Sequence, residues 1–302
     1  MFDTRTRRKL RRIINVGSNE LRAIVTQKSR ALGRRSRNLS EDLTIKRNYA
    51  KYFCRSYDAV VLDYDGTIVS MINRDAGLRS DVIQQLGALL DSGIPVVVIS
   101  GRGRSLLKVR RQLSRFNQGL LFLAMYNGSA IVQGSSAKPV VRKRMRYDSL
   151  ASTFRSLNEN TSFRKLVSKL SLKPYCIEIV PKRRSASYND MLCRRLRTVL
   201  QRKLVARSSG YAVDIYPISI TKDTCLNDVN RILHGNLHFL RVGDQGHELG
   251  NDYELLNSVG GFSVGTISAN PRACFPVVDS DGLSIVGTRG VVHLLTKTFR
   301  IV

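Results

Sequence analysis

Two aspartates separated by one residue, Asp63 and Asp65, follow the apolar run at 59–62. This Ala-Val-Val-Leu run is typical of a strand buried on both faces of a parallel sheet. Gly66 then allows the chain to turn away. Because side chains alternate along a strand, both carboxylates project to the same side, where they repel each other unless a cation lies between them. The pair therefore predicts a cation site or, in the simpler alternative, an Asp-Gly turn with solvated carboxylates.

Other polar residues follow predicted strands in the same way. Further buried strands are predicted over 94–100, 120–132 and 237–244, and helices over 79–93 and 103–116. Strands that alternate with helices predict an α/β fold with a Rossmann-like, doubly wound parallel sheet. In such sheets the binding crevice lies beyond the C-terminal ends of the strands. Ser100, Asn127 and Asp244 are expected there, beside the aspartate pair.

Lys222 is a candidate for binding an anion. A strand gives way near Thr221 to a predicted helix that carries Lys222 in its first turn. The N-terminal end of a helix already favours negative charge. A lysine at this position is therefore better explained by an anion that it binds.

The positive charge is unevenly distributed along the 302 residues. Residues 1–50 hold 14 Lys and Arg against 4 Asp and Glu, and residues 138–207 hold 19 against 4, whereas the remainder is nearly neutral. This division predicts a basic N-terminal arm (1–50), a core in two pieces (51–134 and 216–302) and a basic inserted α/β cap (135–215). A strand, helix and strand in the insertion suggest a lid that excludes water and governs substrate choice. Its charge is expected to surround the site entrance.

Composition limits the protein class and the compartment. With 42% hydrophobic residues the chain can form a core, and no apolar run approaches the ~20 residues of a membrane span. The five cysteines show no C-x-x-C pair, which favours a reducing, cytoplasmic compartment. The arm lacks the apolar segment of a secretory signal. It could instead be a transit peptide, which would make the protein organellar, or form amphipathic helices packed on the core.

The polar residues, taken in chain order, resemble a known family. D63-Y-D65-G-T67, S100-G-R102, Lys222 and G243-D244 with N251-D252 are similar to the four motifs of the haloacid dehalogenase (HAD) superfamily of phosphotransferases. The order of the motifs and the position of the insertion match its C2-capped (type IIB), sugar-phosphatase-like branch. The resemblance covers roughly residues 57–300 and implies a magnesium-dependent phosphatase.

The resemblance assigns catalytic and metal-binding roles. Asp63 would attack the phosphorus to give an aspartyl-phosphate, while Asp65 would protonate the leaving oxygen and later activate water. Mg²⁺ would be held by Asp63, the backbone carbonyl of Asp65 and Asp244. The family's second acid normally follows four residues after the first, which here is Glu248, whereas Asp252 is eight residues away. Asp252 is preferred because Asn-Asp before an apolar segment looks like the usual loop entering its helix.

The resemblance also assigns phosphate and substrate contacts. Thr67, Ser100 and Lys222 would hold the transferred phosphate. Residues expected to contact the substrate are Gly66, Arg102 and Asn127. Each of the hydroxyl and amide residues could also be an ordinary turn residue, and Arg102 a solvated residue at a helix start.

Three functions remain open at this point. The preferred one is a phosphatase for a phosphorylated sugar or similar small metabolite. A second is a phosphatase for a polyanion, such as a nucleic-acid end or a phosphoinositide, which the basic arm and cap would favour. The third is a non-catalytic basic binding protein built on the same fold.

Overall fold

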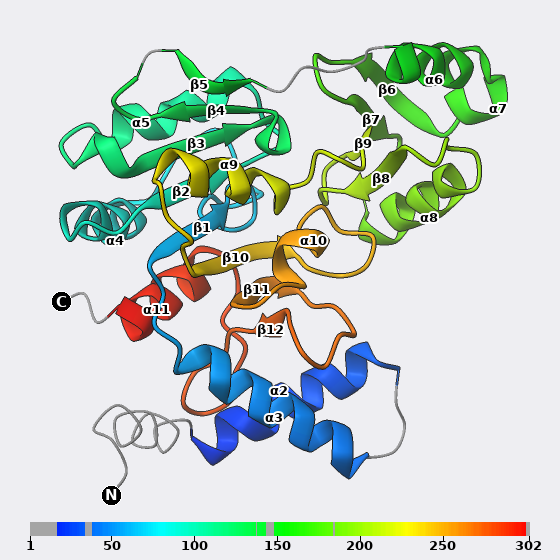
Figure 1. Cartoon of the computed structure of the whole chain (residues 1–302). Coiled ribbons are helices and arrows are strands. Elements are labelled where there is room, and N and C mark those ends of the chain that lie inside the picture. Colours follow the sequence, from blue (N-terminus) through cyan, green and yellow to red (C-terminus); the bar gives the residue numbers. More distant parts are fainter. Residues whose placement is uncertain (1–16, 34–37, 137, 143–147, 184, 300–302) are drawn as a thin grey trace, which may run out of the picture.

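The computed structural model describes residues 17–33, 38–136, 138–142, 148–183 and 185–299 (Figure 1). An eight-stranded sheet forms the core, and a four-stranded sheet forms a separate cap inserted between two parts of the core chain. This arrangement confirms the predicted α/β class and its inserted α/β cap. The first sixteen residues of the predicted arm lie outside the described residues.

The central strand of the large sheet is β1 (Ala59–Asp63). It pairs in parallel with β2 (Val96–Ile99) on one side and with β10 (Phe239–Gln245) on the other. The complete order is β12-β11-β10-β1-β2-β3-β4-β5. The remaining strands are β3 (Leu121–Met125), β4 (Ala130–Gln133), β5 (Pro139–Arg142), β11 (Gly261–Thr266) and β12 (Phe275–Pro276). Every residue of β1 is buried, as its continuous apolar run predicts.

Two strands of the core depart from the prediction. The apolar stretch at 120–132 is not one strand but an antiparallel hairpin of β3 and β4. Its turn uses positive φ angles at Tyr126, Asn127 and Gly128, and the Asn-Gly pair adopts two of these readily. β5 falls in the range assigned to the cap, yet it pairs with β4 in the core sheet. The cap therefore begins after β5, and β9 (Val213–Pro217) also belongs to it.

Helices cover both faces of the large sheet. On one face lie α4 (Ser80–Asp91), α5 (Lys108–Gln112) and α11 (Gly287–Phe299), and on the other lie α9 (Thr224–Ile232) and α10 (Tyr253–Leu256). The alternation of β1 explains this, because Val60 and Leu62 contact the first group and Val61 faces the second. The predicted helix at 103–116 is a 3₁₀ turn (Arg104–Leu107) that leads into α5.

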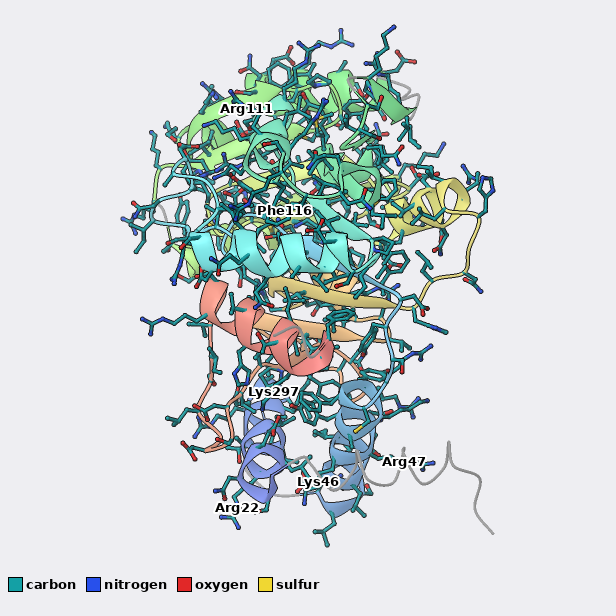
Figure 2. All side chains as sticks on the ribbon, turned by 90° about the vertical axis from the view of Figure 1, so that its left-hand side faces the viewer. Arg22, Lys46, Arg47, Arg111, Phe116 and Lys297 are labelled. Atoms are coloured by element: carbon teal, nitrogen blue, oxygen red, sulfur yellow. The ribbon has the colours of Figure 1, made fainter. Side chains whose placement is uncertain are left out.

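The predicted arm contributes two amphipathic helices, α2 (Ser18–Ala31) and α3 (Leu39–Phe53). They lie beside β12 at the end of the molecule away from the cap (Figure 1). Lys28 is buried, and its Nζ donates to three backbone carbonyls, among them Asn270 at 2.8 Å. Figure 2 labels the exposed Arg22, Lys46 and Arg47 on these helices. The two helices are thus packed on the core, with part of their positive charge facing solvent.

The cap is an antiparallel sheet with helices on one face. Its strand order is β6-β7-β9-β8, with β6 (Val167–Leu172), β7 (Ile177–Pro181) and β8 (Leu204–Ser208). Its helices are α6 (Asp148–Glu159), α7 (Thr161–Arg164) and α8 (Ala186–Arg197). Alternate residues of β7 and β9 pack against these helices, which leaves the intervening residues on the face toward the core.

Candidate active site

The C-terminal ends of three adjacent core strands bring the predicted residues together. Asp63 is the last residue of β1, Ser100 follows β2, and Asp244 lies near the end of β10. All three are buried. Parallel strands end at the same edge of a sheet, so residues far apart in sequence meet there.

Lys222 links two of the buried carboxylates. Its Nζ donates to Asp63 Oδ1 at 2.5 Å and to Asp252 Oδ1 at 2.6 Å. Burial by itself lowers the pKa of Lys222, but the charges of Asp252 and Asp63 outweigh that effect and raise it, so the ammonium form is held. Lys222 lies in the turn before α9 and not in its first helical turn. The anions that it binds in this structure are the two carboxylates.

Asp63 is held from both sides. Thr67 Oγ1 donates to its second oxygen, Oδ2, at 3.1 Å. Burial and the charge of Asp252 raise the pKa of Asp63, whereas the adjacent Lys222 opposes that shift. Thr67 and Lys222 therefore fix the orientation of the carboxylate that was predicted to be the nucleophile.

Asp252 and Asp244 complete the cluster. Asp252 Oδ2 accepts hydrogen bonds from the backbone N–H groups of Asp244 and Gln245, each at 3.0 Å. Gly243 permits this approach, because a Cβ there would lie 2.6 Å from Asp252 Oδ2. Asp252, and not Glu248, therefore occupies the position next to Lys222.

The donor set fits a magnesium ion. Carboxylate oxygens of Asp63, Asp244 and Asp252 all lie within 4.8 Å of one another. Three buried carboxylates face a single lysine, so the cluster carries excess negative charge that a divalent cation would offset. Gly66 lies directly against this group: its φ is +82°, and a Cβ there would be 2.3 Å from Asp244 Oδ2. The structure therefore places Gly66 next to a carboxylate of the cluster. Its contact with the substrate stays a prediction.

Asp65 is paired with Arg102. The guanidinium donates from Nε to Asp65 Oδ2 at 2.8 Å and from Nη2 to Oδ1 at 2.7 Å, a two-pronged geometry that suits a carboxylate. It also contacts Asp75 at 3.1 Å and lies over the Tyr64 ring. Arg102 was predicted to contact the substrate. In the structure it orients Asp65, and both residues line the same cavity.

Ser100 and Asn127 flank this cavity. Ser100 lines it, and its Oγ accepts from the backbone N–H of Arg102 at 3.0 Å. Asn127 is buried behind it, and its backbone N–H donates to the Ser100 carbonyl at 2.8 Å. Among the described residues, the buried Asn127 Oδ1 has no hydrogen-bond partner. Asn127 therefore lies close enough to support the Ser100 loop, although it does not line the cavity.

The cavity itself lies between the core and the cap and has a volume of about 230 Å³. The cap side is formed by polar residues that sequence reasoning missed, namely Lys173, Glu178, Tyr211 and Asp214. Arg74 stacks on the Tyr211 ring at 4.4 Å and links the two domains. The signal was present, since Glu178 and Asp214 are single acids that interrupt apolar strands, but the face of the cap that meets the core was unknown.

The longer fourth motif attaches the core to the cap. Leu249, which belongs to the extra segment, is buried in the hydrophobic core of the cap. The Ser208 N–H donates to the Leu249 carbonyl at 2.8 Å, and the Asn251 N–H donates to the Ser208 carbonyl at 2.9 Å. Arg207 adds an ion pair with Glu254. The loop that carries Asp252 is thus fixed by the cap.

Two further contacts use the same loop. Glu248, the alternative metal ligand, is exposed and pairs with Arg197 at 3.2 Å. His247 contacts Asp190 of α8 at 3.1 Å. The extra residues therefore contact the cap and do not enter the carboxylate cluster.

Three solved structures are similar in fold to this chain. A haloacid dehalogenase-like hydrolase from Bacteroides thetaiotaomicron is 19% identical, with a TM-score of 0.56 over 80% of this chain and 99% of that chain. A putative HAD/COF-like hydrolase from Plasmodium vivax is 16% identical, with a TM-score of 0.60 over 83% and 99%. The trehalose-6-phosphate phosphatase C-terminal domain from C. albicans is 16% identical, with a TM-score of 0.53 over 87% and 97%.

The chain therefore has the fold of the haloacid dehalogenase-like hydrolases, as the resemblance predicted. No protein-family model and no curated protein sequence matches it. No helix in the described part of the chain is both long and apolar enough to cross a membrane.

Proposed function

We propose that the protein is a magnesium-dependent phosphatase that hydrolyses small phosphomonoesters through an aspartyl-phosphate. The observation that carries the proposal is the buried Asp63 carboxylate, held by Thr67 and Lys222 at the floor of a cavity between core and cap. Structural neighbours that are hydrolases and phosphatases support the same reaction class.

In this mechanism Asp63 forms a bond to phosphorus while the bond from phosphorus to the leaving oxygen breaks. Asp65, once protonated, gives its proton to the leaving oxygen, and the resulting carboxylate accepts a proton from the water that hydrolyses the aspartyl-phosphate. Both Asp65 oxygens accept from Arg102 in the structure, so this proton transfer requires Arg102 to release one of them. Lys222 and the Ser100 hydroxyl offset charge on the phosphoryl oxygens. Bound Mg²⁺, held by Asp63 and Asp244 in the cluster that Asp252 completes, would supply additional positive charge for the phosphoryl group.

The dimensions of the site favour a small substrate. The cavity of about 230 Å³ is covered by the cap, which suits a compact leaving group better than a polymer. One structural neighbour is a trehalose-6-phosphate phosphatase, which supports a phosphorylated sugar as the substrate class. The polyanion alternative depends on the basic arm and cap, and several of their cations, such as Arg194 and Lys46, are exposed on helices outside the cavity.

Hydrolysis of an aryl phosphate tests the proposal. We expect turnover with Mg²⁺, loss of turnover with a chelator, and loss of at least about a thousandfold in Asp63→Asn, because the nucleophilic charge is removed. Asp58→Asn is the matched control, since Asp58 is exposed at the other end of β1. Undiminished turnover in Asp63→Asn would refute the assigned nucleophile, and binding without any turnover would favour the non-catalytic alternative.

We further propose, from the absence of a C-x-x-C pair in the sequence, that the protein acts in a reducing, cytoplasmic compartment. Among the described residues no cysteine forms a disulfide. The transit-peptide alternative depends on residues 1–16, which lie outside the described part of the chain.

A further inference from the structure

The cap side of the cavity carries charges that the proposed chemistry does not use. Lys173, Glu178 and Asp214 line it opposite the catalytic carboxylates. Glu178 and Asp214 lie directly across from each other on β7 and β9. A cap with a large positive charge thus presents two carboxylates to the place where a leaving group would lie.

Strand alternation explains how these acids reach the cavity. Ile177, Ile179, Val213 and Ile215 pack into the core of the cap beneath its helices. The intervening residues of the same strands must therefore face the other way, toward the active site. The exposed arginines of α8 lie on the helix-covered side of the cap sheet and do not line the cavity.

The cations near the cap acids are already engaged. Lys173 forms a close ion pair with Glu178. Arg74 lies on the Tyr211 ring and 3.5 Å from Asp65. A second anionic group on a substrate would find no unengaged cation among the described residues that line this cavity.

The Asp214 side chain forms no hydrogen bond or ion pair with the described residues, and the neighbouring charges that act on it most are those of Glu178 and Lys173. Its Oδ2 would lie 3.5 Å from a Cβ on Gly101, so it approaches the loop that follows Ser100. Burial, and then the charge of Glu178, raise the pKa of Asp214 to about 7. A half-buried carboxyl group without a partner, beside the predicted phosphate position, is placed to bind part of the substrate.

We propose that Asp214, with Glu178, recognises the leaving group and selects one that donates hydrogen bonds and carries no second anionic group. Above neutral pH, where a group with a pKa of about 7 is ionised, the Asp214 carboxylate only accepts hydrogen bonds. Hydroxyl or ammonium groups then satisfy it, whereas another phosphate or carboxylate would be repelled. The inference rests on the proposed phosphatase activity and names its substrate class as monophosphates of compact polyols or amino sugars.

Three substrates with one hexose skeleton test this selection: glucose 6-phosphate, glucosamine 6-phosphate and glucose 1,6-bisphosphate. For the full chain with Mg²⁺ at pH 8, where Asp214 is mainly ionised, we expect kcat/KM to be at least about tenfold lower for the bisphosphate than for either monophosphate. Each compound is also measured as a competitor of aryl phosphate hydrolysis, which reports binding even where turnover is slow.

Asp214→Asn is the critical variant. It should lower the ratio of kcat/KM for glucosamine 6-phosphate to kcat/KM for the aryl phosphate about tenfold, and reduce the discrimination against the bisphosphate by a similar factor. Glu178→Gln should shift these ratios of kcat/KM in the same direction, and it replaces Asp214→Asn as the test if that variant does not fold. Asp148→Asn, an exposed acid on α6, is the control that should leave all ratios unchanged.

The two proposals fail in different ways. Aryl phosphate turnover with equal kcat/KM and equal competition for all three hexoses would overturn the selection and leave the phosphatase standing. If the ratios of kcat/KM between the substrates were unchanged in both Asp214→Asn and Glu178→Gln, the selection would likewise be overturned and the phosphatase would stand. Absence of aryl phosphate turnover would overturn the proposed function itself, and the selection with it.

Discussion

Replacing Lys222 by Met should cost both stability and activity. A lysine that served only a substrate anion could be removed with little loss of stability. In the structure, however, its ammonium group is almost fully buried and bridges Asp63 at 2.5 Å and Asp252 at 2.6 Å. Without Lys222, two buried carboxylates face each other with no compensating charge.

The size of the effect follows from breaking a buried ion pair. Leaving a buried charge without its partner costs about 3–5 kcal/mol. Each kcal/mol lowers Tm by roughly 2–4 °C in domains of ~150–250 residues, so a decrease of roughly 6–20 °C is expected. Melting should be measured by circular dichroism in chelator, because a bound divalent cation would itself compensate the carboxylates.

A double variant separates the structural role from the catalytic one. Lys222→Met with Asp252→Asn removes one of the uncompensated charges and should recover more than half of the lost Tm, whereas aryl phosphate turnover stays lost. Lys46→Met, on an exposed site of α3, is the matched control and should change the free energy of unfolding by less than ~0.5 kcal/mol. A single variant as stable as the wild type, or a double variant less stable than the single, would refute the reasoning.

Three further predictions follow from individual contacts. Gly66→Ala places a Cβ 2.3 Å from Asp244 Oδ2 at a positive φ, so aryl phosphate kcat should fall roughly 100-fold; normal turnover would contradict the close approach. Leu249→Ala should destabilise the cap by about 2–3 kcal/mol and speed amide exchange in β8, and unchanged exchange would argue against Leu249 as an anchor of the cap. Burial, as the largest cause, raises the pKa of Asp214 to about 7 in the folded protein, whereas the unfolded chain releases this proton above about pH 4. The folded state is therefore stabilised by the bound proton at low pH and loses that stabilisation as pH rises through 7. Asp214→Asn should therefore raise Tm relative to wild type more at pH 8 than at pH 5, and an equal difference at both pH values would count against the shift.

Local sequence signals predicted much of the core. The apolar run before Asp63 indicated a strand buried on both faces, and its alternation with helical segments indicated a doubly wound sheet. Both signals are short-range, since burial of a strand and the turn at Gly66 depend on adjacent residues. The roles assigned to the site residues stay predictions, but the structure brings Asp63, Lys222, Asp244 and Asp252 together.

Contacts between distant segments were decided only by the tertiary structure. Spacing along the chain left Glu248 and Asp252 as alternatives; docking of Leu249 into the cap directs Glu248 outward and Asp252 inward. The sequence did not indicate that Arg102 pairs with Asp65, which lies 37 residues earlier in the chain; the contact of Arg102 with a substrate stays a prediction.

The net charge of the cap, read from the sequence, likewise did not show which charged side chains face the cavity. Its sequence carries a large excess of Lys and Arg, which led to the expectation of a basic site entrance. Net charge is a sum over all residues, whereas the field in a cavity depends on the few side chains that face it. The sequence by itself determined which residues alternate along β7 and β9. Only the packing of helices on one face of the cap decided that Glu178 and Asp214 face the active site.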